Sequence, residues 1–248
     1  MKAMVFAAGL GTRLRPLTND RPKALVDVSG RTMLAITLER LRGFGVNEVI
    51  INTHHFAGMV RAYLEARRNF GMRIEISQED VLLDTGGGLK KAAWFFLENS
   101  DEPFVVHNVD VISTIDLAQM VEFHRQQGAL ATLAVQKRKT GRPLMFDGDG
   151  QFRGRAAPGE VSSYGGMELL AFSGIHVIAP RIFEKITEDG VFSIIDTYVR
   201  LAAQGEKIIG FRADGYYWRD LGRPESVERT ARDIAEGKLS TFPDGKTT

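Results

Sequence analysis

The residues best suited to chemistry follow the first apolar run of the chain. That run, residues 4 to 6, is followed by two small residues, two glycines, a hydroxyl and two arginines: Ala7, Ala8, Gly9, Gly11, Thr12, Arg13 and Arg15. Glycines let backbone N–H groups turn toward an anion and approach it closely. Arginines add fixed charge that can fork onto phosphate oxygens. The order predicts a strand that leads into a phosphate-binding loop.

A dinucleotide-binding turn is the nearest alternative, because it is also glycine-rich and also follows the first strand. Its third glycine would fall at position 14, which is Leu14, and Pro16 interrupts the helix that should begin there. The lysine of a P-loop is also missing after the second glycine. An NAD-dependent oxidoreductase is therefore disfavoured.

A second glycine cluster, Gly86 to Gly88, comes just before an apolar segment that we expect to be helical. Three consecutive glycines cost conformational entropy unless something needs a bare backbone. A nucleobase lying flat against that backbone fits this requirement, with Gln78 or Glu79 supplying polar contacts to its edge. A simple turn at the start of a helix is the alternative.

Polar side chains also follow two of the expected strands. The apolar segment 103–112 predicts a central strand that carries Asn108 and Asp110 near its carboxyl end, where ligands bind in parallel sheets. Asp110 is therefore a metal candidate, or it caps the following loop. His54 and His55 follow an earlier strand, but no third ligand has a recognisable spacing, so a loop-capping or rim role competes with metal binding.

The composition excludes several classes of protein. The 248 residues are 44% apolar, with 32 basic and 31 acidic side chains, so the charge balance does not point to nucleic acid or an anionic membrane. The absence of cysteine excludes disulfides, thiolate metal sites and a cysteine nucleophile. No apolar run approaches the roughly 20 residues of a membrane span. We expect a cytoplasmic enzyme that has no nucleic-acid or membrane partner.

Strands and helices alternate along most of the chain and would position these residues. The patterns predict strands at 48–52, 72–77, 103–112, 130–135, 168–178 and 207–212, a hairpin at 146–152, and helices at 32–44, 58–70, 117–127, 192–204 and from 225. This alternation predicts an α/β fold with a doubly wound, mostly parallel central sheet flanked by helices. We expect a single domain, residues 1–238, with two halves at about 1–128 and 129–238, and a flexible tail at 239–248.

The motifs together resemble those of the sugar-1-phosphate nucleotidylyltransferases. The resemblance rests on A-A-G-L-G-T-R-L-R-P-L-T followed by P-K-A-L, on L-D-T-G-G-G, on F-S-G-I-H-V and on W-R-D-L-G-R-P-E, which occur in the family's order over most of the chain. The family joins a nucleoside triphosphate to a sugar 1-phosphate and releases pyrophosphate. The resemblance implies a Rossmann-like, GT-A-like nucleotidyltransferase fold, with a nucleotide half at about 1–128 and a sugar-phosphate half at about 129–238.

The resemblance also implies roles for individual residues. Arg13 and Lys23 would act on the phosphates, and Asp110 and Asp220 would hold Mg²⁺. The other nucleotide contacts would come from Ala7, Ala8, Gly9, Gly11, Thr12, Gln78, Gly86, Gly87, Gly88 and Asn108, and the sugar contacts from Glu168, Ser173 and Gly174. A bulge in the strand is an alternative explanation for Ser173 and Gly174.

The chain departs from the family pattern at two points. Val109 precedes Asp110 where the family usually has glycine, and the E-K-P-like segment, whose lysine touches the sugar phosphate in many relatives, cannot be placed. The branch that looks most similar uses UTP and N-acetylmuramic acid 1-phosphate in cell-wall recycling. Alternatives are a GTP-using heptose or mannose 1-phosphate guanylyltransferase and a non-catalytic nucleotide-sugar-binding regulatory subunit. We expect a monomer or a homodimer.

Overall fold

The computed structural model describes residues 1–98, 101–156 and 165–239. The expected tail therefore lies outside the described residues except for Leu239. The described chain forms two compact units. The first contains Met1–Leu82, His107–Ile115 and the chain from Tyr216 onward, and the second contains Leu83–Val106 and Asp116–Gly215. These units differ from the expected halves on either side of residue 128, because the chain passes between the units four times.

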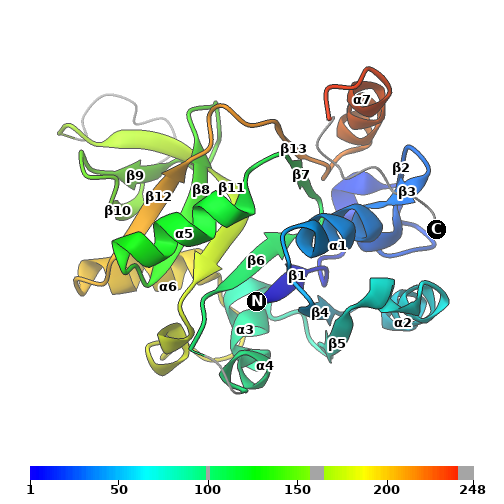
Figure 1. Cartoon of the computed structure of the whole chain (residues 1–248), viewed down its shortest axis with the longest axis horizontal. Helices are drawn as coiled ribbons and strands as arrows, with labels where there is room; N and C mark the ends of the chain where they lie inside the picture. The colour runs from blue at the N-terminus through cyan, green and yellow to red at the C-terminus, as the bar shows by residue number, and fades with distance from the viewer. Residues whose placement is uncertain (99–100, 157–164, 240–248) are drawn as a thin grey trace. The chain divides into compact units, whose positions relative to one another are not determined.

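Three parallel strands form the centre of the first unit. β1 (Lys2–Phe6) pairs with β4 (Glu48–Thr53), which pairs in turn with β5 (Arg73–Gln78). The crossovers contain α1 (Met33–Gly43) and α2 (Ala57–Ala66). The β-branched run in β4 is buried, as expected for a strand covered on both faces. Figure 1 shows β1, β4 and β5 side by side.

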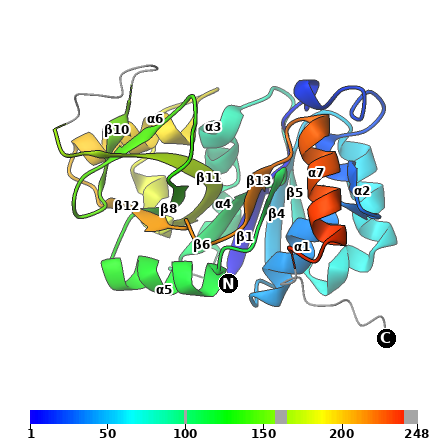
Figure 2. The same ribbon diagram turned by 90° about the horizontal axis from the view of Figure 1, so that it is seen from above.

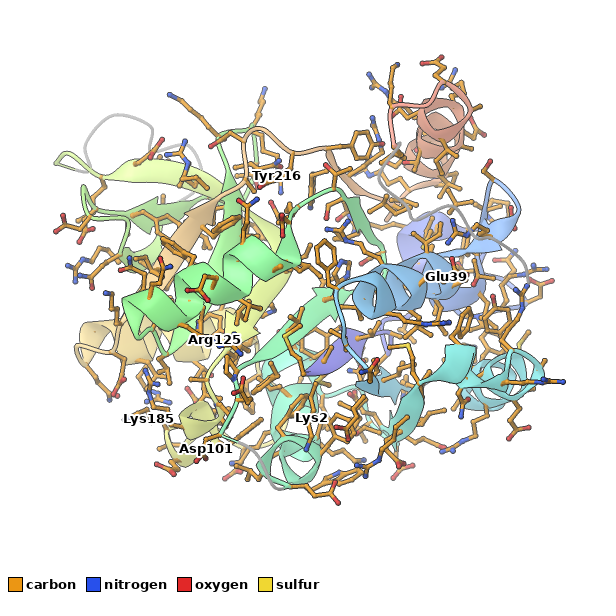
Figure 3. All side chains as sticks on the ribbon, in the orientation of Figure 1. Lys2, Glu39, Asp101, Arg125, Lys185 and Tyr216 are labelled. Carbon is orange, nitrogen blue, oxygen red and sulfur yellow. The ribbon has the colours of Figure 1, made fainter. Side chains whose placement is uncertain are left out.

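Several short elements and the last helix complete the first unit. They are the 3₁₀ turns η1 (Thr12–Leu14), η2 (Lys23–Leu25) and η3 (Arg68–Gly71), the strands β2 (Asp27–Val28), β3 (Arg31–Thr32), β7 (Val111–Ser113) and β13 (Trp218–Asp220), and the last helix α7 (Pro224–Ala235). β7 and β13 pair antiparallel, as do β2 and β3. The chain returns to this unit at Tyr216, which is labelled in Figure 3, and continues directly into β13.

The second unit is built around a mixed set of strands. Its strands are β8 (Ala131–Gln136), β9 (Leu144–Phe146), β10 (Phe152–Arg155), β11 (Glu168–Ile178) and β12 (Ile208–Arg212). Its helices are α3 (Asp84–Lys91), α4 (Ala93–Leu97), α5 (Leu117–Gln127) and α6 (Ile194–Ala203), with the 3₁₀ turn η4 (Pro180–Glu184). β11 pairs antiparallel with β8 and β9, whereas β12 pairs parallel with β8. Figure 2 shows α5 and α6 on opposite sides of these strands.

The predicted fold class, α/β with a mostly parallel sheet flanked by helices, is confirmed, with some local corrections. The expected single strand 103–112 is two strands, β6 (Phe104–Asn108) and β7, and Asp110 lies in the turn between them. Gly86 to Gly88 lie inside α3 and not before it. Among the described helices, none combines the length and the apolar character needed to span a bilayer.

Candidate active site

The glycine-rich loop leaves β1 and turns at Gly11. Gly11 has a φ of +64°, in the left-handed region that favours glycine, and begins η1. The Thr18 hydroxyl donates to the Gly11 carbonyl at 2.8 Å. A Cβ at Gly11 would lie 3.1 Å from both Lys23 Cβ and Thr18 Cγ2, so the backbone angle favours glycine and the space for a side chain is tight. The next residues, Thr12 and Arg13, are exposed and accessible to a ligand.

Lys23 lies across the loop and contacts Asp110. Its Nζ is 3.1 Å from Asp110 Oδ2, and the two side chains are only 14% and 13% exposed. Gly9 makes room for this lysine, because a Cβ at Gly9 would lie 3.3 Å from Lys23 Nζ. The structure thus brings together a loop glycine, a lysine and a carboxylate that the sequence predicts separately.

The pairing of β7 with β13 places Asp220 beside Asp110. Asp220 is the register partner of Val111, and Leu221 donates its backbone N–H to the Asp110 carbonyl at 2.7 Å. Gly222 donates its N–H to Asp220 Oδ1 at 2.6 Å, which fixes this carboxylate. Two aspartates that are 110 residues apart in sequence are therefore held on adjacent backbone segments of one unit.

Arg13 joins the same group through Gly222. A Cβ at Gly222 would lie 2.7 Å from Asp220 Oδ1 and 2.9 Å from Arg13 Nη2. The carboxylate and the guanidinium thus both lie against the bare α-carbon of Gly222, which is buried. The sequence motif W-R-D-L-G contains this glycine, but only the structure reveals its role.

The donor set at Asp110 and Asp220 fits Mg²⁺. This ion prefers hard oxygen ligands and usually binds one or two protein carboxylates together with water and substrate phosphates. The described residues contain no cluster of three or more His, Cys, Asp or Glu side chains that could form an all-protein cage. Two aspartates on joined backbone segments meet the requirement for a site that substrate oxygens complete.

The remaining first-unit candidates lie near the carboxyl ends of the parallel strands. Gln78 is exposed at the end of β5, and His54 Nδ1 contacts the Glu79 carbonyl at 2.8 Å, which agrees with a loop-capping role for this histidine. The Asn108 carbonyl contacts His107 Nδ1 at 2.8 Å. Val109 is fully buried and donates its N–H to the Phe6 carbonyl at 3.1 Å, so its bulk is accommodated in the core.

His107 is a buried histidine three residues before Asp110. Burial, with a smaller contribution from the nearby Arg40 guanidinium, lowers its pKa to about 4. The imidazole is therefore neutral at physiological pH and places no positive charge next to the lysine–aspartate pair.

The three glycines of α3 lie in the second unit and have a packing role. A Cβ at Gly86 would lie 2.3 Å from the Phe192 ring, and a Cβ at Gly87 would lie 2.3 Å from the Gly190 carbonyl oxygen. The Phe192 carbonyl accepts from the N–H of Gly86 at 2.9 Å and of Gly87 at 3.3 Å. Close packing of loop 190–192 on α3 therefore accounts for at least two of these glycines, and their contact with a nucleobase stays a prediction.

The candidates for the sugar contacts lie on β11, also in the second unit. The pairing of β11 with β8 shifts register between Phe172 and His176, and Gly174 has a φ of +72°. The bulge considered as an alternative is thus present, and it contains the fully buried Ser173. Glu168, at the start of the strand, forms an ion pair with Arg212 at 2.5 Å. Sugar binding by these residues stays a prediction.

Comparisons with known proteins identify relatives of this chain. Residues 2–146 match the family described as Nucleotidyl transferase. The chain is 36% identical over 247 residues to N-acetylmuramate alpha-1-phosphate uridylyltransferase of Caulobacter vibrioides, covering 94% of this chain and 97% of the relative. It is 33% identical to mannose-1-phosphate guanylyltransferase 1 of Arabidopsis thaliana, covering 90% of this chain but only 62% of that protein.

Solved structures share the fold at lower sequence identity. HddC from Yersinia pseudotuberculosis, complexed with GMP-PN, matches with a TM-score of 0.76 at 22% identity, over 94% of this chain and 99% of that one. A putative glucose-1-phosphate thymidylyltransferase from Bacillus anthracis matches with a TM-score of 0.79 at 19% identity, over 100% of this chain and 97% of that one. With the sequence match, these comparisons confirm the resemblance: this chain belongs to the nucleotidyl transferase family, as a sugar-1-phosphate nucleotidyltransferase.

Proposed function

We propose that this chain transfers a uridylyl group from UTP to N-acetylmuramic acid 1-phosphate and releases pyrophosphate. The observation that carries the reaction is the group formed by Arg13, Lys23, Asp110 and Asp220 at the glycine-rich loop. The choice of substrates is supported by the uridylyltransferase of Caulobacter vibrioides, which has nearly the same length as this chain.

The chemistry requires mainly charge neutralisation and positioning, because both reactants are anions. Arg13 would bind the β and γ phosphates, where negative charge develops as pyrophosphate leaves, and backbone groups of Gly11 and Thr12 would orient them. Lys23, already held near Asp110, would neutralise the α-phosphate and the incoming sugar phosphate. When bound by Asp110 and Asp220, Mg²⁺ supplies Lewis acidity. In-line attack by the sugar phosphate needs no protein nucleophile.

A guanylyltransferase acting on mannose or heptose 1-phosphate is the second candidate. Several relatives between 31% and 33% identical are named mannose-1-phosphate guanylyltransferases, and one structure with the same fold contains GMP-PN. A non-catalytic regulatory subunit is disfavoured, because the arginine, the lysine and both aspartates are all present.

One assay separates these candidates. The protein is incubated with Mg²⁺, one of UTP, GTP, dTTP, CTP or ATP, and one of N-acetylmuramic acid, mannose, heptose or glucose 1-phosphate, and pyrophosphate release is measured. We expect UTP with N-acetylmuramic acid 1-phosphate to give the highest kcat/KM. Faster turnover with GTP would reject the uridylyl assignment but not the reaction class, and no release from any pair would reject catalysis.

The metal ligands are tested by removing one charge at a time. Asp110→Asn and Asp220→Asn keep the size of each side chain, and we expect each to lower kcat by at least about a hundredfold, because a lost contact to the developing charge costs roughly 3 kcal/mol. Asp149→Asn, at an exposed position between β9 and β10, is the control and should retain activity. Activity of both site variants in chelator, at the wild-type rate, would contradict the assignment.

The proposed substrates also suggest where the enzyme works. Nucleoside triphosphates are made in the cytoplasm, so we infer a cytoplasmic enzyme that returns a cell-wall sugar to nucleotide-sugar synthesis. Subcellular fractionation with an antibody to the chain tests the location.

A further inference from the structure

A buried polar pair connects the ends of all three parallel strands of the first unit. Asn52, in the last part of β4, is 3% exposed, and Glu79, immediately after β5, is 2% exposed. Neither residue contacts the phosphates in the proposed mechanism, and the burial of Glu79 leaves Gln78 as the candidate for the contact to the base edge. An amide and a carboxylate this deeply buried are costly unless their hydrogen bonds are made.

The hydrogen bonds of the pair end at the glycine-rich loop. Asn52 Oδ1 accepts from the backbone N–H of Ala7 at 2.7 Å, and Asn52 Nδ2 donates to Glu79 Oε1 at 2.8 Å. Ala7 is the first residue after β1, whose last residue, Phe6, is the register partner of Asn52. The side chain of Asn52 therefore extends the sheet by one hydrogen bond into the start of the loop.

The direction of these bonds is fixed by chemistry. The Ala7 N–H can only donate, so the amide oxygen of Asn52 must face it, and the amide NH₂ must face Glu79. Glu79 is itself anchored, because its N–H donates to the Thr53 carbonyl at 2.7 Å and its carbonyl contacts His54 Nδ1 at 2.8 Å. The Glu79 carboxylate thus orients the Asn52 amide, and the Asn52 amide oxygen fixes the backbone N–H of Ala7.

We propose that Asn52 and Glu79 are positioning residues for nucleotide binding, setting the backbone of residues 7–11 in the conformation that receives the triphosphate. The inference rests on the proposed role of this loop in binding the β and γ phosphates. Its consequence is selective: disturbing the pair weakens the triphosphate site more than the site of the sugar phosphate. Backbone N–H groups bind an anion most tightly when their conformation is fixed before the anion arrives. A hydrogen bond that fixes Ala7, the first residue of the loop, should therefore increase the affinity for the triphosphate.

Exchanging the amide of Asn52 and the carboxylate of Glu79 between the two positions tests the proposal. Asn52→Asp places two carboxylates face to face and removes the donor to Glu79. We expect it to raise the Kd for Mg-UTP at least tenfold, with a change of less than threefold in the KM for the sugar 1-phosphate. Glu79→Gln alone should be mild, because the glutamine oxygen can still accept from Asn52. In the double variant Asn52→Asp/Glu79→Gln, the aspartate accepts from both Ala7 and the new amide, so the Kd should return to within threefold of the wild-type value.

Gln136→Glu is the matched control. Gln136 is also a buried amide, and it donates to the Ala213 carbonyl at 2.7 Å in the second unit. The same amide-to-carboxylate change there should lower thermal stability without changing the Kd for Mg-UTP. If Asn52→Asp does not fold, Asn52→Ala replaces it, with the same expected rise in Kd.

The outcomes separate this inference from the proposed function. A folded Asn52→Asp with an unchanged Kd, or a double variant as weak as the single one, overturns the positioning role. Arg13→Ala tests the loop itself: if it leaves the Kd for Mg-UTP unchanged, the proposed triphosphate site is wrong. If Arg13→Ala weakens binding and Asn52→Asp does not, only the positioning role fails.

Discussion

At the scale of single residues, glycines determine how closely the charged groups approach. Gly9 leaves space for Lys23, and Gly222 leaves space for both Asp220 and Arg13. A Cβ at Gly222 would come within 2.9 Å of the carboxylate and the guanidinium, closer than real Cβ contacts. The charged residues are thus placed partly by the absence of side chains around them.

This arrangement predicts a large effect for a single methyl group. We expect Gly222→Ala to lower kcat at least tenfold, because the new Cβ displaces Asp220, Arg13 or both. Gly215→Ala is the matched control, since nothing lies within 4 Å of its added Cβ. Steady-state kinetics of the two variants measure the difference, and equal activities would contradict the role of Gly222.

Arg13 should bind the β and γ phosphates in the substrate complex and contact them more strongly in the transition state, where negative charge develops. Arg13→Ala removes a charge-assisted contact to the phosphates that is worth roughly 2 to 4 kcal/mol, so we expect kcat/KM to fall about a hundredfold or more. Arg61→Ala, on the exposed side of α2, is the control and should change kcat/KM less than twofold. Similar losses in both variants would show that Arg13 is not specific to the reaction.

The sequence indicates the charged candidates of the site, but it does not indicate the buried residues that fix the loop beside them. Arg13, Lys23, Asp110 and Asp220 are identified because family motifs mark them, whereas Asn52 lies in an apolar strand pattern without any motif. Its partners, Ala7 and Glu79, are 45 and 27 residues away. A side chain whose role depends on such distant partners leaves no local signal in the sequence.

At the scale of elements, α3 shows how tertiary packing changes the meaning of a motif. The helix contains three glycines, which lower helix propensity by about 1 kcal/mol each relative to alanine. It is held instead by loop 185–194: Ile194 N–H donates to Thr85 Oγ1 at 3.0 Å, and Lys90 Nζ donates to the Glu188 carbonyl at 2.7 Å. The glycines permit this close contact.

The packing predicts opposite effects for the same substitution in two helices. Gly87→Ala should lower the free energy of unfolding by about 2 kcal/mol or more, because its Cβ meets a backbone carbonyl that has no flexible side chain to move. Gly58→Ala, in α2 with open space around it, should raise the same quantity by up to about 1 kcal/mol. Denaturant titrations measure both, and stabilisation by Gly87→Ala would contradict the packing role.

Elements with strong periodic patterns were predictable, and short ones were not. The expected strand 168–178 has the observed bounds of β11, and the expected helix 117–127 has those of α5. β13 has only three residues and pairs with β7 across about 100 residues of sequence, so no local pattern reveals it. The break between β6 and β7 leaves no clear signal in the sequence, because Val109 and Val111 extend the apolar pattern on either side of Asp110.

At the scale of the whole molecule, each unit contains a buried histidine whose charged form is disfavoured by its surroundings. Burial lowers the pKa of His107 in the first unit to about 4, and Arg40 contributes. Burial also lowers the pKa of His124 in the second unit to about 4, with a contribution from Arg181. His124 Nδ1 contacts Thr132 Oγ1 at 2.9 Å, and His107 Nδ1 contacts the Asn108 carbonyl at 2.8 Å. Each ring therefore has a polar partner within its own unit.

These two groups predict the pH dependence of stability. A histidine with a pKa near 6.5 when unfolded and near 4 when folded binds more protons in the unfolded state between these values, so its contribution is complete above pH 6.5 and is lost as the pH falls toward 4. At pH 5 each histidine should cost about 2 kcal/mol relative to pH 7.5. Denaturant titrations at the two pH values should therefore show a marked loss of stability in wild type. His124→Gln should be less stable at pH 7.5 but lose less on acidification, and an equal loss in wild type and variant would exclude His124 as a source of the effect.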